Sequence, residues 1–293
     1  MSTVDLSWAD AAAAVSFLLQ TALAILIVGG LWLVLNRITS FNDHHEIMVR
    51  RNWPYLVQRL GVLLAHIIGA TACFDFSGRI SGVFVAFMGL LWVTVVLVVA
   101  YLVIERYLGR TPRLHDAHKD NMGISITKAA AFVMVGLILN GALSGSTPST
   151  EIAISATVTF TALGLIAAFG GVKLRNLREH QNLLAASRSG KLAASFELTG
   201  VLLAMGILLR NAIAGDFVSW SAALIGFGLT FVISMVLLYP LRAISNRVIF
   251  HYCSVSEAQR EDAEVPAAAM AGVLVGVAVL VSSIVTPIVN LLN

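Results

Sequence analysis

The chain has 293 residues, of which 58% are hydrophobic and only 12% are charged. Its mean hydropathy is +0.87, whereas soluble globular domains carry about 25% charged residues. This composition excludes an ordinary soluble enzyme. It also excludes a nucleic-acid-binding protein, because the net charge of +3 is not gathered on a basic soluble domain. Lipid is therefore the expected surroundings of most of the chain.

Long apolar runs predict an all-α membrane protein with eight transmembrane helices. A bilayer core about 30 Å thick requires roughly 20 apolar residues in a helix. A barrel strand would alternate in polarity, whereas runs such as Leu90 to Val99 are apolar on both faces. The eight runs are Ala11 to Leu35, Trp53 to Phe74, Ile80 to Ile104, Met122 to Leu143, Ile152 to Gly170, Lys191 to Ala214, Trp220 to Leu241 and Val265 to Leu292.

Basic residues predict the orientation of the helices. Four of the segments between runs hold 14 of the 19 Lys and Arg residues, whereas the other side of the membrane has only Arg79. Since basic loops are retained in the cytoplasm, both termini should lie outside. The first ten residues contain two Asp and no Lys or Arg, unlike a cleaved signal peptide, so the first helix should be retained. The four basic segments are 36–52, 105–121, 171–190 and 242–264.

An internal repeat organises the chain. The sequence GVLLA at residues 61–65 recurs at 200–204, an offset of 139, which predicts two four-helix repeats, 1–146 and 147–293. Chance identity between apolar helices is the alternative. A finer offset of 69 relates Arg59 to Lys128 and Asn52 to Asn121, so that a helical hairpin used four times is a second interpretation. Repeats with an even number of spans keep their orientation, so these repeats should be parallel.

The segments at the inner ends resemble a family of bacterial inner-membrane proteins typified by the YjfL protein, whose domain has no assigned function. The resemblance rests on FNDHHEIMVRRN at 41–52 with the apolar run that follows it, and on Ser189 to Lys191 leading into 192–204. It implies two four-helix units in tandem in the bacterial inner membrane, and it implies no reaction. Arg51 stands where the family has Gly, and Lys191 where it has Asn.

Ionisable residues inside the spans are the candidate functional residues, because charge within a membrane is costly. Arg59, Lys128 and Glu197 fall at similar depths in their helices, and Glu197 could pair with either cation. We therefore expect a polar layer lining a cavity open to the inside. Snorkelling to the headgroups is the alternative for Arg59, Lys128 and Arg210, and a structural salt bridge is the alternative for Glu197. The last run contains no ionisable residue, so the fourth hairpin should only pack.

Polar stripes extend this hypothesis along two helices. Asn52, Arg59, His66 and Cys73 are spaced by seven, which places them on one side of the second helix. Glu197 and Asn211 lie fourteen apart on the sixth helix. Two such stripes could form a hydrophilic path between the repeats. For His66, a hydrogen bond to a neighbouring backbone carbonyl is the more ordinary interpretation.

The remaining histidines and the sequence motifs predict neither a metal nor a cofactor. His115 and His118 could share a helical face, but no metal-binding motif supports them, and they are interpreted as solvated loop residues. The chain has no nucleophile elbow, phosphate-binding loop or dinucleotide-binding fingerprint, so enzymatic activity is the least favoured function.

Two functions remain open. The first is a channel or transporter for a small charged solute, with Arg59, Lys128 and Glu197 as its selectivity or coupling element. The second is a membrane scaffold or stress-response component whose basic inner loops dock a cytoplasmic protein or lipid headgroups. A transporter needs the charged groups to face a wet cavity, whereas a scaffold can leave them paired and dry. The bilayer itself is the partner common to both.

Overall fold

The computed structural model describes residues 8–39, 43–74, 80–108, 122–178, 182–251 and 253–292. All regular secondary structure within these segments is helical, which confirms the all-α prediction. The long helices are α1 (Trp8–Ile38), α2 (Trp53–Thr71), α3 (Ile80–Leu108), α4 (Met122–Leu143), α5 (Thr150–Arg178), α7 (Leu192–Ile213), α8 (Trp220–Ile249) and α10 (Glu264–Leu292). Three short helices connect them: η1 (His45–Val49), α6 (Leu183–Arg188) and α9 (Val255–Arg260).

Seven of the long helices in the described segments are long and apolar enough to cross a membrane. The exception, α2, has 19 residues and carries the polar side chains of Gln58, Arg59 and His66, all of them buried. Because α2 carries the GVLLA sequence shared with α7 and packs along α4, we count it as the eighth crossing. The chain is therefore a multi-pass membrane protein.

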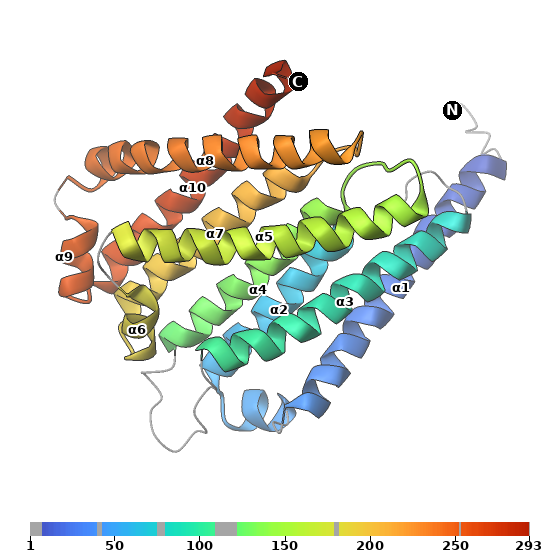
Figure 1. The fold of residues 1–293 in the computed structure, drawn as a ribbon. Helices are drawn as coiled ribbons and strands as arrows, with labels where there is room; N and C mark the ends of the chain where they lie inside the picture. The colour runs from blue at the N-terminus through green and yellow to red at the C-terminus, as the bar shows by residue number, and fades with distance from the viewer. Residues whose placement is uncertain are drawn as a thin grey trace, which may run out of the picture.

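The helices form two rows, and each hairpin contributes one helix to each row (Figure 1). The central row consists of α2, α4, α7 and α10, in which α2 packs against α4, α4 against α7, and α7 against α10. The covering row consists of α1, α3, α5 and α8 and lies across one face of the central row. The order along the central row follows the chain, so α2 and α10 lie at its two ends.

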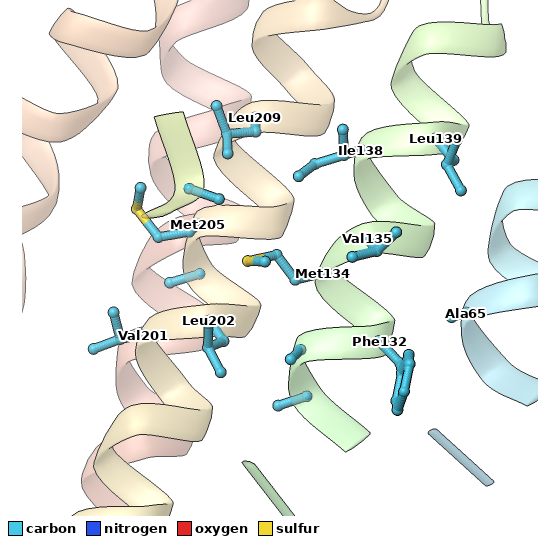
Figure 2. Close-up of a cluster of buried hydrophobic side chains, with 14 of the residues drawn as sticks. Ala65, Phe132, Met134, Val135, Ile138, Leu139, Val201, Leu202, Met205 and Leu209 are labelled. Carbon is cyan, nitrogen blue, oxygen red and sulfur yellow. The ribbon is translucent and has the colours of Figure 1, made fainter. Parts of the chain in front are cut away.

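Close backbone contact holds the central row together. A Cβ atom built on Gly61 would lie 2.4 Å from Ala129 Cα, and one on Gly136 would lie 2.4 Å from the carbonyl oxygen of Ala65. In the second half, a Cβ on Gly200 would lie 2.9 Å from Ala271 Cα. Helices associate in lipid through such close packing, because apolar burial gives little drive there. Around these contacts, side chains of α4 and α7 such as Met134 interdigitate (Figure 2).

The two ends of the helix rows differ in their connections. At one end, called here the connector end, lie η1, α6 and α9; the opposite end, called the turn end, carries the tight turns α4–α5 and α7–α8. Gly145 and Gly215 allow these tight turns, with φ of 99° and 148°. The turns are joined to each other, since the backbone N–H and the hydroxyl of Ser146 both donate to Asp216 Oδ1 at 2.7 Å.

The bond between Ser146 and Asp216 should make stability depend on pH. Because both donors favour the ionised carboxylate, they hold the pKa of Asp216 below its usual value of 3.8. Such a group stabilises the fold above its unfolded pKa, and the contribution is lost as the pH falls through the folded pKa. We expect wild type to melt above Asp216→Asn at about pH 6, and this difference to shrink by about pH 2.5. Equal differences at both pH values, measured by thermal unfolding in detergent, would contradict the assignment.

Candidate functional site

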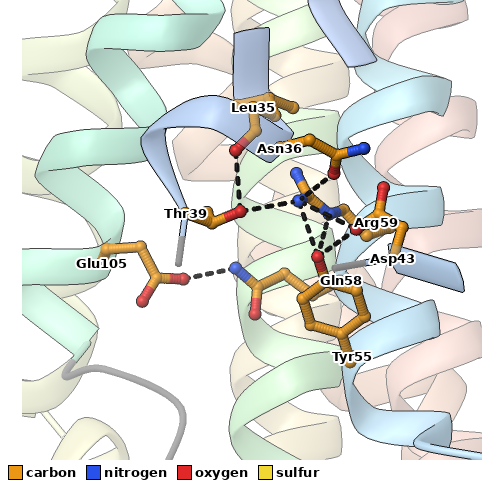
Figure 3. Close-up of polar contacts among 8 residues, drawn as sticks. All are labelled: Leu35, Asn36, Thr39, Asp43, Tyr55, Gln58, Arg59 and Glu105. Carbon is orange, nitrogen blue, oxygen red and sulfur yellow. Dashed lines mark hydrogen bonds and ion pairs between the residues drawn. The ribbon is translucent and has the colours of Figure 1, made fainter. Parts of the chain in front are cut away.

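Arg59 lies in the second turn of α2 and is bound on several sides at the connector end (Figure 3). Its Nη2 donates to Asp43 Oδ1 at 3.1 Å and to Thr39 Oγ1 at 3.0 Å. Asn36 Oδ1 accepts from the same nitrogen at 3.1 Å, and Nε donates to the hydroxyl of Tyr55 at 2.9 Å. The side chain is 1% exposed. Arg59 is therefore held by an ion pair within the protein and does not reach headgroups.

Aromatic rings complete the surroundings of Arg59. The guanidinium carbon lies 5.0 Å from the centre of the Tyr55 ring, 5.6 Å from Trp32 and 6.0 Å from Tyr101. The faces of aromatic rings attract cations, most strongly where water is excluded. The Tyr55 hydroxyl also donates to Asp43, which links the ring to the ion pair. Asp43, Tyr55 and Arg59, with Asn36 and Thr39, are called here the first cluster.

The second cluster consists of Gln58, Glu105 and Lys128. Lys128 Nζ lies 2.9 Å and 3.0 Å from the two carboxylate oxygens of Glu105 on α3, and the lysine side chain is fully buried. Gln58 on α2 donates to the same carboxylate and points away from its neighbour Arg59 (Figure 3). Glu105 therefore links α3, its own helix, to both α2 and α4.

The third cluster consists of Arg175, Glu197 and Arg242. One oxygen of Glu197 on α7, Oε1, accepts from Arg175 Nη2 at 2.9 Å and from Arg242 Nη2 at 2.5 Å. All three side chains are at least nine-tenths buried. Glu197 therefore joins α5 and α8 through α7. Beside it lies a cavity of about 10 Å³, lined by Arg175 and Arg242 among other residues, which is about the size that admits one water molecule.

The three clusters occupy corresponding positions in the repeat. Asn36, Glu105, Arg175 and Arg242 stand at the same place near the connector ends of the four covering helices, at successive offsets of 69, 70 and 67. Their partners lie in the second turns of α2, α4 and α7. In the first half Glu105 is on a covering helix and the cations Arg59 and Lys128 are on the central row, while Asp43 lies in the connection just before η1. In the second half this arrangement is reversed. We call the three clusters together the charged layer.

The structure does not bring Arg59, Lys128 and Glu197 together. The expected pairing of Glu197 with Arg59 or Lys128 is wrong, because each of the three has partners from its own part of the repeat. The expectation that the fourth hairpin only packs is also wrong, since α8 supplies Arg242. The remaining cation, Arg210, lies near the turn end and donates from Nε to Asn140 Oδ1 at 2.5 Å.

The other residues of the predicted stripes have separate roles. Asn52 caps α2, accepting from the backbone N–H of Tyr55 at 3.1 Å, and its amide donates to Glu46. His66 is buried and its Nε2 lies 3.0 Å from Thr94 Oγ1 on α3. Asn211 donates to the carbonyl oxygen of Ser282 on α10. These contacts join helices to one another, and the residues lie at different heights along the bundle.

The partners Asp43, Glu105, Arg175 and Arg242 were missed from the sequence because they lie in segments assigned to basic loops. The structure extends α3, α5 and α8 into those segments. The signal that could have found three of them was the offset near 69, applied to Asn36. Two further predictions, Arg79 outside the membrane and solvated His115 and His118, fall outside the described residues. Within the described residues, no cluster of metal-ligating side chains is formed.

Comparison with known proteins identifies the family. A family model described as Domain of Unknown Function (DUF350) matches residues 7–143 and, a second time, residues 149–285. The double match confirms that the chain consists of two related units, each with four long helices. Searches of curated proteins and of solved structures gave no match. The chain therefore belongs to the DUF350 family and carries two copies of its domain in tandem.

Proposed function

We propose that the protein is a channel or transporter for a small charged solute, closed at the connector end by the charged layer. The observation that carries the proposal is that two carboxylates of the charged layer, those of Glu105 and Glu197, each bond to two other helices. Glu105 bonds to α2 and α4, and Glu197 bonds to α5 and α8. Neutralising one of these carboxylates would weaken its contacts to two helices at once.

The energetic cost of the charged layer supports a functional role. Burying an ion costs several kcal/mol, and apolar side chains of similar volume often pack as well or better than a buried ion pair. Packing alone therefore gives no reason to retain Arg59, Lys128 and Glu197 within the bundle. Ionisable groups in membrane spans commonly mark the path of an ion or solute. Opening would exchange the internal partners of the layer for water and solute, beginning at the cavity beside Arg175 and Arg242.

The position of the layer follows from the proposed orientation. The segments at the connector end carry most of the basic residues, which favours placing that end in the cytoplasm of a bacterial inner membrane and both chain termini outside. In this orientation the charged layer is an inner gate. The apolar faces of the covering row, with exposed Leu26 and Leu33 of α1, would contact lipid.

Neutralising Glu197 tests the gate. Glu197→Gln should weaken both contacts to arginine. Losing one such charged hydrogen bond, worth about 1.5–3 kcal/mol, corresponds to about a 10- to 100-fold rise in the population of the open state. We expect liposomes containing this variant to release potassium or chloride at least about tenfold faster than wild type. Glu151→Gln, at the exposed start of α5, is the matched control and should release ions at the wild-type rate.

A scaffold function is the second candidate, favoured by the dry, paired state of the three clusters. In this case the exposed polar residues at the connector end, such as Arg50 and Arg188, would dock anionic headgroups or a cytoplasmic protein. The same experiment separates the two functions. Equal ion release from wild type, Glu197→Gln and Glu151→Gln would exclude a gate at Glu197 and leave the scaffold as the better account.

A further inference from the structure

The central row contains one junction between the two repeats, formed by α4 and α7. At this junction α4 presents Gly123, Met134 and Gly141. A Cβ on Gly123 would lie 2.4 Å from Ser195 Oγ, and one on Gly141 would lie 2.7 Å from the carbonyl oxygen of Arg210. Met134 lies against Gly206, where the corresponding distance from the glycine to Met134 Cα is 3.0 Å. The last central-row helix of the first repeat therefore packs against the first central-row helix of the second repeat.

The repeat shows which faces correspond to this junction at the two ends of the row. The contact of Gly61 with Ala129 recurs as that of Gly200 with Ala271, so α2 maps onto α7 with an offset of 139 and α4 onto α10 with an offset of 142. Adding 142 to the residue numbers on the α4 side of the junction gives an α10 end face. Subtracting 139 from those on the α7 side, Ser195, Gly206 and Arg210, gives an α2 end face. The α10 end face consists of Val265, Gly276 and Ser283, and the α2 end face consists of Leu56, Ile67 and Thr71.

Both end faces are largely exposed within the described chain, although Asn140 on α4 donates to the hydroxyl of Thr71, in the α2 end face, at 3.0 Å. Val265 is 80% exposed and Gly276 and Ser283 are also exposed, although their counterparts on α4 are all buried. A Cβ on Gly276 would meet no atom within 4 Å. On the α2 end face, Ile67 is 46% exposed. The faces that are buried at the α4–α7 junction thus have exposed counterparts on α10 and α2, at the two ends of the central row.

The two end faces are complementary in shape. At the junction a large side chain, Met134, lies against Gly206. At the ends the sizes are exchanged, because the counterpart of Met134 is Gly276 and the counterpart of Gly206 is Ile67. An isoleucine facing a glycine fills the same kind of contact as a methionine facing a glycine. The small residue Gly276 also lets another helix approach closely in lipid.

We propose that the α10 end face binds the α2 end face of a second copy of this chain. The contact is heterologous, since different faces of the two copies meet, and it continues the central row from one molecule into the next. All central helices run in the same direction from the connector end to the turn end, so the two copies keep the same orientation in the membrane. The partner of each end is thus the other end of an identical chain.

Cysteine cross-linking tests this contact. In a Cys253→Ser background, in which buried Cys73 is retained, Ile67→Cys and Gly276→Cys are introduced together and oxidised in membranes with copper phenanthroline. Two thiols, one from each copy, lose their protons and two electrons to the copper oxidant and form a disulfide. We expect a ladder of linked chains for the pair and none for either single variant. Absence of the ladder, or equal linking by Ile67→Cys alone, would overturn the proposal.

Two further variants control for position and for folding. The pair Ile67→Cys and Val236→Cys places one thiol on the exposed face of α8 and should give no ladder. Gly276→Leu has free space within the chain, so it should fold as wild type does. It should nevertheless shift the mass measured by native mass spectrometry from oligomer to monomer. An unchanged oligomer, or a wild-type protein that is already monomeric, would overturn the proposal.

Discussion

Replacing Lys128 with methionine should destabilise the protein by up to about 3–5 kcal/mol, the range for removing one partner of a buried ion pair, because Glu105 is 18% exposed. Methionine fills nearly the same volume, but Glu105 would lose its cation within the bundle. Gln58 would remain as a neutral donor to that carboxylate. Equilibrium unfolding in mixed detergent, followed by circular dichroism, measures the loss.

The double variant Lys128→Met with Glu105→Leu separates the ion pair from the packing of the two side chains. Removing both charges should recover most of the stability, to within about 1–2 kcal/mol of wild type, because no buried ion is left unpaired. The result would show that the ion pair is dispensable for stability, so that packing does not explain why it is present. Losses that simply add in the double variant would instead show that each side chain is needed for packing.

Replacing Gly136 with leucine should prevent α2 and α4 from packing. A Cβ at this position would lie 2.4 Å from the carbonyl oxygen of Ala65 and 2.6 Å from its Cα, so backbone must move to make room. Overpacking usually costs about 1–3 kcal/mol, and a clash with backbone belongs at or above the upper end of that range. We expect little folded protein after extraction in mild detergent, as judged by a monodisperse peak in size-exclusion chromatography.

Gly226→Leu on α8 is the matched control for this substitution. Gly226 is also a helical glycine in a transmembrane helix, but a Cβ there would meet no atom within 4 Å. This variant should be extracted and eluted as wild type is. If both leucine variants were lost equally, the effect would come from the larger side chain in the membrane and not from the contact with Ala65.

The sequence predicted the central row better than the covering row. The starts of α2 and α4 agree with the apolar runs, whereas α3, α5 and α8 continue past the predicted ends at Ile104, Gly170 and Leu241. An apolar search ends where polar and charged residues accumulate, but a helix continues as long as its backbone hydrogen bonds are made and its charges find partners. The missing turns are those that carry Glu105, Arg175 and Arg242.

This truncation also explains what was missed in the candidate site. Arg59, Lys128 and Glu197 were recognised because they interrupt apolar runs, and the structure buries all three. Their partners lie at helix ends, where a charge is not unusual and gives no signal by itself. Only the offset between hairpins reveals that Asn36, Glu105, Arg175 and Arg242 share one position. Pairing between those positions depends on how the rows pack, which spacing along one helix does not determine.

The reversal of charge between the two halves affects how the hairpins find their order during insertion. Four similar hairpins offer each central helix several alternative neighbours, and misassembly between like units is a known failure of repeat proteins. Placing Glu197 beside Glu105 would bury two carboxylates together without their cations, which would make that arrangement unfavourable. The charged layer would thus favour the native order of the hairpins over other orders. A chain built from two copies of the first half would lack this reversal of charge and therefore this preference.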